Sequence, residues 1–349
     1  MTTKILLVIH MLLVPVIIFG AKVAVLPEIT HPYGFRVDGD RFFVTQEVTI
    51  FIYSTKDYKL IKKFGTEGEG PGEILLDRRA GNDEIGISIR PDFLIVNSIF
   101  KVLYFTKDGE YVKEYKIAGT GGRMVEPLGN QFVGKTFHNK EGVIYHGVAI
   151  YDANLDKVKE IYHHKHGWQG SEAEFNPLTM EQAAFEICDD KIFVLDGDRT
   201  KIIGYNSKGE KLFTITHNDD LVKFTDKHKE EMVQNYKLNP SWKVYYEMKK
   251  RFFKFPEYFP PIHWYYIDPL EKKIYLETEK VENQKRKYIV YDFKGKLIKK
   301  IMLPIEQEKV LGNLTAFYGG KCYQLFENET TEECELYILT DVDINSQLY

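Results

Sequence analysis

The sequence predicts an all-β fold: a six-bladed β-propeller of four-stranded antiparallel blades, with a short helical insertion between blades 4 and 5. Three observations predict it. Aromatic residues, which favour strands, make up 14% of the 349 residues. A motif of an aromatic residue, a polar turn and a strand of alternating charge recurs at intervals of roughly 50 residues. A second hairpin pattern precedes most of these motifs, so each unit supplies four strands.

The chain begins with a predicted signal peptide, residues 1–20. Lys4 is followed by the apolar run Ile5–Phe19 and then by the small residues Gly20 and Ala21. A basic residue, an apolar stretch and small residues at its end are typical of an export signal. Pro15 interrupts the run, which is shorter than the roughly 20 residues of a membrane-spanning helix. We therefore expect an exported protein, periplasmic or extracellular; an uncleaved membrane anchor is the alternative.

Residues 21–349 are predicted to form the propeller as one domain. The repeated turn motifs are Tyr53–Lys63, Phe105–Glu114, Tyr151–Glu160, Tyr205–Thr214 and Tyr291–Lys300. Their Asp-Gly and Lys-Gly steps supply the positive φ that tight hairpins need. The hairpins before them include Phe35–Val44, Ile87–Val96, Phe185–Val194 and Tyr265–Tyr275. Residues 310–343 form a sixth unit, and Lys22–Leu26 is expected to return as its outermost strand and close the ring.

The interval before the last turn motif is too long for one blade, which places an insertion at about residues 217–262. One helix is expected from Asp226, presenting Met232, Val233 and Tyr236. A second is expected from Pro240-Ser241, with an apolar face of Val244, Tyr245, Met248 and Phe252. Prolines at 256, 260 and 261 end the helical region. We expect this helical hairpin to lie over one face of the ring.

Two segments resemble a known family. Phe64–Glu73, which is rich in glycine, and Phe255–Ile262, which follows the inserted helices, are similar to segments of secreted bacterial six-bladed β-propellers related to NHL-repeat proteins. The resemblance spans about residues 30–343. It implies the fold and export, but no settled activity and no catalytic residues.

Three cysteines, Cys188, Cys322 and Cys334, are too few for a disulfide framework. If residues 322–338 form a hairpin, Cys322 and Cys334 approach each other and form a disulfide. The alternative is that both are unpaired, buried residues.

Candidate ligand-binding residues lie in loops before the innermost strands, where propellers usually carry function. Arg78 and Arg79 precede the second blade and offer bidentate bonds to a carboxylate or sugar acid; the alternative is pairing with surface acids. The loops before other inner strands carry acidic residues and histidines. For each of these residues taken alone, the alternative is a solvated side chain without a binding role. The full candidate set is His31, Arg78, Arg79, Glu126, Glu181 and His263.

Metal and phosphate sites are not expected. In a strand, His164 and His166 of the run His163–His166 face the same side, and His138 or His146 approaches them, but no carboxylate or cysteine stands at a ligand spacing. Exposed histidines are the simpler interpretation. The Gly65–Gly72 stretch lacks the Lys-Ser/Thr ending of a phosphate loop and is acidic, so a crossover between blades is expected there. We therefore expect no cofactor.

Composition limits the partners. The 47 basic and 51 acidic residues give a net charge of −4, so no general attraction to nucleic acid or anionic lipid follows. The run 249–255 interleaves Lys249, Lys250, Arg251 and Lys254 with three phenylalanines. Such a run contacts a membrane surface or partner, or else is a solvated helix face. Membrane contact is otherwise expected only through an uncleaved signal segment.

The function that the sequence favours is an exported binding or interaction module. Its ligand, a small molecule, glycan or protein, is expected at the axial opening of the ring. No nucleophile elbow, HExxH zinc motif or kinase motif is present. The alternative is an enzyme of the same shape, a hydrolase or lyase acting on a sugar or lactone with an axial metal or acid/base pair.

Overall fold

The computed structural model describes residues 21–76, 85–117, 125–166, 174–179, 183–219, 221–238, 240–304, 314–328 and 330–340. These residues form six four-stranded antiparallel sheets, each a blade. Blades 1 to 3 consist of β2 (Gly34–Asp38), β3 (Arg41–Gln46), β4 (Thr49–Ser54), β5 (Leu60–Phe64); β6 (Gly86–Ile89), β7 (Leu94–Ser98), β8 (Lys101–Phe105), β9 (Tyr111–Lys116); and β10 (Val125–Leu128), β11 (Gln131–Lys140), β12 (Val143–Tyr151), β13 (Lys157–Lys165). Blades 4 to 6 consist of β14 (Ala184–Cys188), β15 (Lys191–Leu195), β16 (Lys201–Asn206), β17 (Lys211–Thr216); β18 (Ile262–Asp268), β19 (Lys273–Glu282), β20 (Lys285–Asp292), β21 (Leu297–Pro304); and β22 (Leu314–Tyr318), β23 (Lys321–Asn328), β24 (Glu333–Leu339), β1 (Ala21–Leu26).

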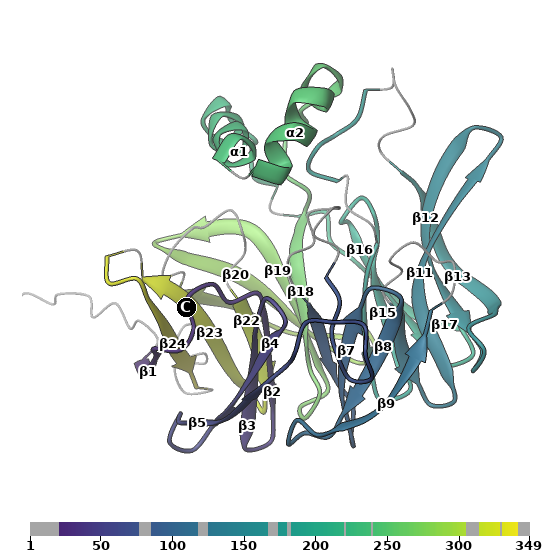
Figure 1. Ribbon diagram of the computed structural model, residues 1–349. Helices are drawn as coiled ribbons and strands as arrows, with labels where there is room; N and C mark the ends of the chain where they lie inside the picture. The colour runs from purple at the N-terminus through teal and green to yellow at the C-terminus, as the bar shows by residue number, and fades with distance from the viewer. Residues whose placement is uncertain are drawn as a thin grey trace, which may run out of the picture.

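The sheets stand around a common axis (Figure 1). The first strand of a blade is the innermost, and it contacts the first strands of neighbouring blades, as β2 contacts β6 and β22. The predicted six-bladed propeller is therefore confirmed.

The ring closes through β1. This strand pairs antiparallel with β24, with Leu26 opposite Cys334 and Ala21 opposite Ile338. Lys22 Nζ lies 3.1 Å from Glu335 Oε1, and Leu26 is fully buried. The N-terminal strand is thus the outermost strand of blade 6, as the sequence predicted, and it covers the edge that β24 would otherwise expose.

Glycine in the repeated turn has two separate reasons. Gly109 and Gly295 adopt φ values of 74° and 77°, which L side chains rarely adopt. A Cβ added at Gly109 would lie 2.6 Å from the Phe64 ring of blade 1, and one at Gly295 would lie 2.9 Å from the Phe213 ring of blade 4. The turn of each of these blades therefore packs against the outer strand of the blade before it.

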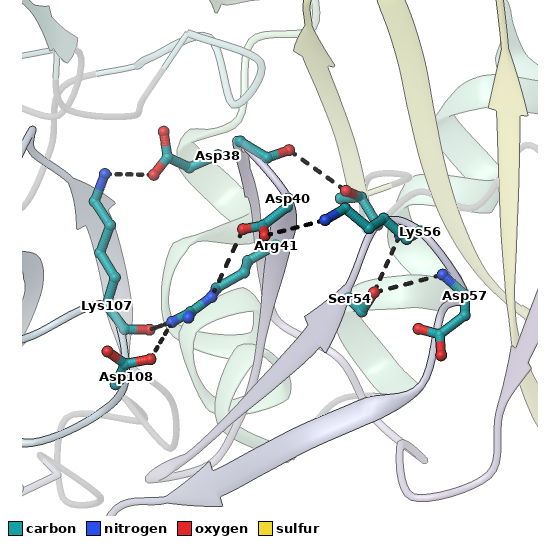
Figure 2. Close-up of polar contacts among 10 residues, drawn as sticks. Asp38, Asp40, Arg41, Ser54, Lys56, Asp57, Lys107 and Asp108 are labelled. Atoms are coloured by element: carbon teal, nitrogen blue, oxygen red, sulfur yellow. Dashed lines mark hydrogen bonds and ion pairs between the residues drawn. The ribbon is translucent and has the colours of Figure 1, made fainter.

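Ion pairs hold the same turn in place between blades 1 and 2 (Figure 2). Arg41 Nη1 donates to the Lys107 carbonyl oxygen at 2.8 Å and lies 2.6 Å from Asp108 Oδ1. Lys107 Nζ lies 2.5 Å from Asp38 Oδ2. These contacts lie at the end of β2, on the ring face opposite the loops that enter the inner strands.

The core is divided among the blade interfaces. Among the described residues, six clusters of buried apolar side chains each join two neighbouring blades. Between blades 5 and 6, for example, the rings of Tyr275 and Phe317 stack with centroids 3.8 Å apart. Burying each such side chain contributes about 1.5–3 kcal/mol, so the ring is held together by its interfaces as much as by its sheets.

The insertion forms two helices, α1 (Asp226–Leu238) and α2 (Pro240–Lys249), followed by the 3₁₀ turn η2 (Lys250–Phe252). The helices begin at the predicted residues and stand above one face of the ring (Figure 1). The predicted apolar face of α2 is only partly covered: Phe252 is buried, whereas Val244 and Met248 are 61% and 58% exposed. Within the described part of the chain, neither helix has the length and apolar character needed to cross a membrane.

The predicted disulfide does not form. Cys322 pairs with Leu339 at one end of the β23–β24 hairpin, whereas Cys334 pairs with Glu327 at the other. A disulfide needs Cα atoms within about 7 Å, and five residues of strand separate these two positions along the hairpin. All three cysteines are free and buried.

Candidate functional site

An ion pair crosses the axis of the ring. Arg36 of β2 and Glu186 of β14 face the axis from blades 1 and 4, which are opposite each other in a ring of six. Arg36 Nη2 lies 3.3 Å from Glu186 Oε1. The two side chains are 41% and 31% exposed, so solvent reaches both. The pair therefore bridges the middle of the ring and still presents charge of both signs to water.

A second, more buried pair lies beside it. Arg90, which follows β6, contacts Glu126 of β10 with 2.5 Å between Nη2 and Oε2, and the side chains are only 15% and 12% exposed. The Arg90 guanidinium also donates to the carbonyl oxygens of Pro127 at 3.0 Å, Ile89 at 2.9 Å and Ile187 at 3.4 Å. One arginine thus ties blades 2, 3 and 4 together near the axis.

The four charged groups influence one another. Burial raises the pKa of Glu186, and the Glu126 carboxylate adds to the rise, while Arg36 and Arg90 oppose it. Each carboxylate therefore has an arginine beside it, and the pairing matters most for Arg90 and Glu126, which water scarcely reaches.

A polar network at the start of β18 forms a separate group. His263 Nδ1 lies 2.8 Å from Glu279 Oε1 on β19. Arg286 Nη1 of β20 lies 3.2 Å from Glu277 Oε1, and the Tyr266 hydroxyl donates to the other Glu277 oxygen at 2.9 Å. Burial opposes protonation of His263, but the carboxylates of Glu277 and Glu279 outweigh it and raise the pKa of the imidazole. The His263 side chain remains 36% exposed.

The candidate residues from the sequence fall into different places. Arg78, Arg79 and Glu181 lie outside the described residues. His31 is 80% exposed beside Glu327, with 3.6 Å between Nδ1 and Oε1. Glu126 and His263 lie within inner strands rather than in the loops before them. The three described candidates each have a different ion-pair partner, so the structure does not bring them together.

Sequence reasoning missed the residues that meet at the axis, namely Arg36, Arg90 and Glu186. A signal for two of them was present: Phe35-Arg36-Val37 and Phe185-Glu186-Ile187 place a charge between two buried apolar residues. In a strand that alternation points the charged side chain away from the interface between blades. On the innermost strand, away from that interface means toward the axis.

The histidines of blade 3 lie on both faces of its sheet. His146 pairs with His164 across β12 and β13, so the side chains of His146, His164 and His166 share one face. His163 lies on the other face, 60% exposed and 3.4 Å from Glu160. The exposed interpretation therefore fits His163 but is wrong for His164, whose ring nitrogens are buried. Among the described residues, no three histidine, cysteine or acidic side chains are arranged to hold a metal ion.

The aromatic residues of the run 249–255 are used within the protein. Phe252 is buried, the Phe253 ring lies 5.3 Å from Phe175, and the Phe255 ring stacks on Phe224 at 5.8 Å. Lys250 lies 2.6 Å from Glu247. These phenylalanines are therefore occupied by contacts within the insertion and with the 174–179 segment.

Comparisons with known proteins give distant similarity of shape. No family model matches the chain, and no curated protein matches it. A solved structure of a protein from Bacteroides fragilis NCTC 9343, described as exported, has a TM-score of 0.49 and 12% identity over 93% of this chain and 91% of that one. U3-55K has a TM-score of 0.39 and 8% identity, with 88% and 80% covered. Hsv2 from Kluyveromyces marxianus has a TM-score of 0.36 and 8% identity, with 88% and 85% covered. The fold assignment thus depends on the six sheets themselves, and the NHL-related membership stays a prediction.

Proposed function

We propose that the chain is an exported binding module that holds a polar, carboxylate-bearing ligand, such as an acidic sugar, at the axis of the ring. The observation that carries the proposal is the Arg36–Glu186 pair, which is formed by two opposite blades and is still reached by solvent. A guanidinium is well suited to bind a carboxylate through two parallel hydrogen bonds. Glu186 would accept hydrogen bonds from hydroxyl groups of the same ligand.

Binding is favoured over chemistry at this axial pair. A general acid or base must give or take a proton readily near neutral pH. Each carboxylate at the axis is instead held in an ion pair: Glu186 lies 3.3 Å from the Arg36 guanidinium, and Glu126 lies 2.5 Å from that of Arg90. Such pairs hold charge in place, which suits recognition.

The segment 1–20 is the basis for proposing export. The position of β1 in the ring is compatible both with cleavage of this segment and with its retention as a membrane anchor. Ala21 pairs with Ile338 near the end of β24. That end of β24 lies on the ring face opposite the insertion and the entry to β18 (Figure 1). A retained anchor would therefore leave the insertion face turned away from the membrane. Cleavage before Ala21 would leave β1 complete.

The test is ligand binding by the chain from residue 21 onward. We would measure binding of glucuronate, galacturonate and uncharged glucose by calorimetry, and then test Arg36→Met and Glu186→Gln. Arg41→Met is the matched control, because Arg41 is also ion-paired at a blade junction but lies on the other ring face. We expect the acids to bind and Arg36→Met to weaken them at least tenfold. Unchanged affinity in Arg36→Met would refute the axial site, and equal binding of glucose would refute the carboxylate class.

One observation favours a second candidate, a hydrolase acting on a sugar or lactone. Glu279 orients the imidazole of His263 and stabilises its protonated form, while the ring stays partly exposed. An imidazole that is oriented by a carboxylate and reached by solvent has the properties of a general acid. Hydrolysis of aryl glycosides and lactones that disappears in His263→Gln, with the fold intact by circular dichroism, would support this candidate; no turnover by the wild-type protein would dismiss it.

A further inference from the structure

Three imidazole rings lie together where the long hairpin of blade 3 leaves the propeller ring. The β11–β12 hairpin extends beyond the other blades on the face that carries the insertion (Figure 1). His146 on β12 lies opposite His164 on β13, and His166 follows two residues later. The ring centroids of His146 and His166 are 4.4 Å apart, and those of His146 and His164 are 6.3 Å apart.

Two of these rings, those of His146 and His164, are poorly placed to carry a charge. His146 is only 9% exposed. Both ring nitrogens of His164 are buried and have no hydrogen-bond partner among the described residues. Its ring packs against blade 4 so closely that a Cβ at Gly197 would lie 2.2 Å from His164 Cδ2. A neutral imidazole is tolerated in such a place, whereas an imidazolium without an acceptor is costly.

The surrounding charges are divided. Lys135 of β11 opposes a charge on His146, as do the other two histidines. The β15–β16 loop of blade 4 brings Asp196 and Asp198, which favour a charge on His164. Asp196, however, already accepts hydrogen bonds from the backbone N–H groups of residues 200 and 201 and from the Thr200 hydroxyl. His163, on the opposite face, further opposes a charge on His164. Tyr162 stays neutral, because burial raises the pKa of its hydroxyl.

Burial dominates this balance. It lowers the pKa of His146 to about 4, with His166 and His164 contributing, and it lowers the pKa of His164 despite the aspartates. The folded state therefore binds protons more weakly than an opened state in which the rings meet water. Protonation then favours opening as the pH falls from about 6.5 toward 4.

We propose that His146, His164 and His166 form a pH-sensitive latch that holds the β12–β13 end of blade 3 against blade 4 at neutral pH and releases it in acid. The contacts that would be lost are those of the His164 ring with Gly197 and of the Tyr162 hydroxyl, which accepts the Gly197 N–H at 2.8 Å. For His146 alone, a pKa of about 4 when closed and about 6.5 when open shifts the open fraction about 20-fold between pH 7 and pH 5. The latch would make the projecting hairpin, which flanks the insertion face, respond to acidification.

Hydrogen exchange measured by mass spectrometry tests this latch. Exchange of residues 131–166 at pH 7 and pH 5, corrected for the intrinsic rate, is expected to speed up about 20-fold or more in wild type, while the inner strands of blades 1 and 5 change little. His146→Phe keeps an aromatic ring and is expected to remove most of the change. His163→Phe, on the opposite face of β13, is the matched control and is expected to keep it.

A histidine ring titration by NMR on the wild-type protein keeps the test decisive if His146→Phe does not fold. The latch requires the His146 ring to titrate well below 6.5. Titration at the ordinary value, exchange that speeds up equally in all blades, or an unchanged response in a folded His146→Phe variant would each overturn it.

Discussion

Replacing Arg90 with Met is expected to destabilise the ring by about 3–5 kcal/mol, because it leaves the Glu126 carboxylate buried without its partner. The guanidinium also serves three carbonyl oxygens from blades 2, 3 and 4, those of Ile89, Pro127 and Ile187. Water does not readily replace these bonds, because the Arg90 and Glu126 side chains are only 15% and 12% exposed. The loss therefore includes both an unpaired charge and several unsatisfied acceptors.

Glu126→Gln is expected to cost less, about 1–3 kcal/mol, because Arg90 keeps its carbonyl acceptors and a neutral amide replaces the carboxylate. In the double variant Arg90→Met/Glu126→Gln no charge is left unpaired. The double variant is therefore expected to be more stable than the sum of the single losses predicts, by about 1–3 kcal/mol. Arg41→Met, which breaks the more exposed pair with Asp108, is expected to cost only about 0–1 kcal/mol and serves as the control.

Urea unfolding at pH 7, followed by tryptophan fluorescence and far-ultraviolet circular dichroism, measures the four variants against the wild-type protein. The two probes must report one transition for the free energies of unfolding to be comparable. Additivity of the single variants within about 0.5 kcal/mol would show that Arg90 and Glu126 are not coupled. An Arg90→Met loss no larger than that of Arg41→Met would refute the claim that the buried pair ties the three blades together.

Four further outcomes follow from the packing. Gly197→Ala is expected to cost about 1–3 kcal/mol by thermal unfolding, because its Cβ would overlap the His164 ring; an unchanged melting temperature would contradict that contact. Phe317→Ala is expected to cost about 3–5 kcal/mol in urea, since it removes a stacked ring between blades 5 and 6. Deleting residues 21–26 is expected to expose the edge of β24 and cause aggregation on size-exclusion chromatography; a monomeric, equally stable product would argue against closure by β1. When the protein is unfolded without reductant and treated with an alkylating agent, its intact mass is expected to show three modified cysteines. A single modification would instead indicate a disulfide between two of them.

The local patterns in the sequence predicted the architecture because each acts within a few residues. The Asp-Gly and Lys-Gly steps need positive φ at Gly109 and Gly295, and the structure has it there. Asp226 and Pro240 are the first residues of α1 and α2, since an acidic side chain in the first turn and proline at the first position favour a helix start locally. The sixth unit supplies only three strands, whereas the other units supply four. This count predicted that the N-terminal strand completes blade 6.

Other features depended on register and could not be predicted. Cys322 and Cys334 sit in one hairpin, but a shift of pairing by several residues decides whether their sulfur atoms meet, and the loop length alone does not fix it. The apolar spacing of Val244 and Met248 indicated a covered face on α2, yet the insertion packs mainly through its phenylalanines. Helical spacing shows which residues share a face, not whether anything covers it.

Local periodicity and turn chemistry were enough to predict the all-β class, the number of blades, the closing strand and the position of the insertion. The contact of Arg36 with Glu186 across the axis and the stacking of His146 on His166 arise from the assembled ring. Arg36 and Glu186 are 150 residues apart in the chain, and no local rule relates them. Their distance is fixed by the radius of the closed ring, a property of all six blades together.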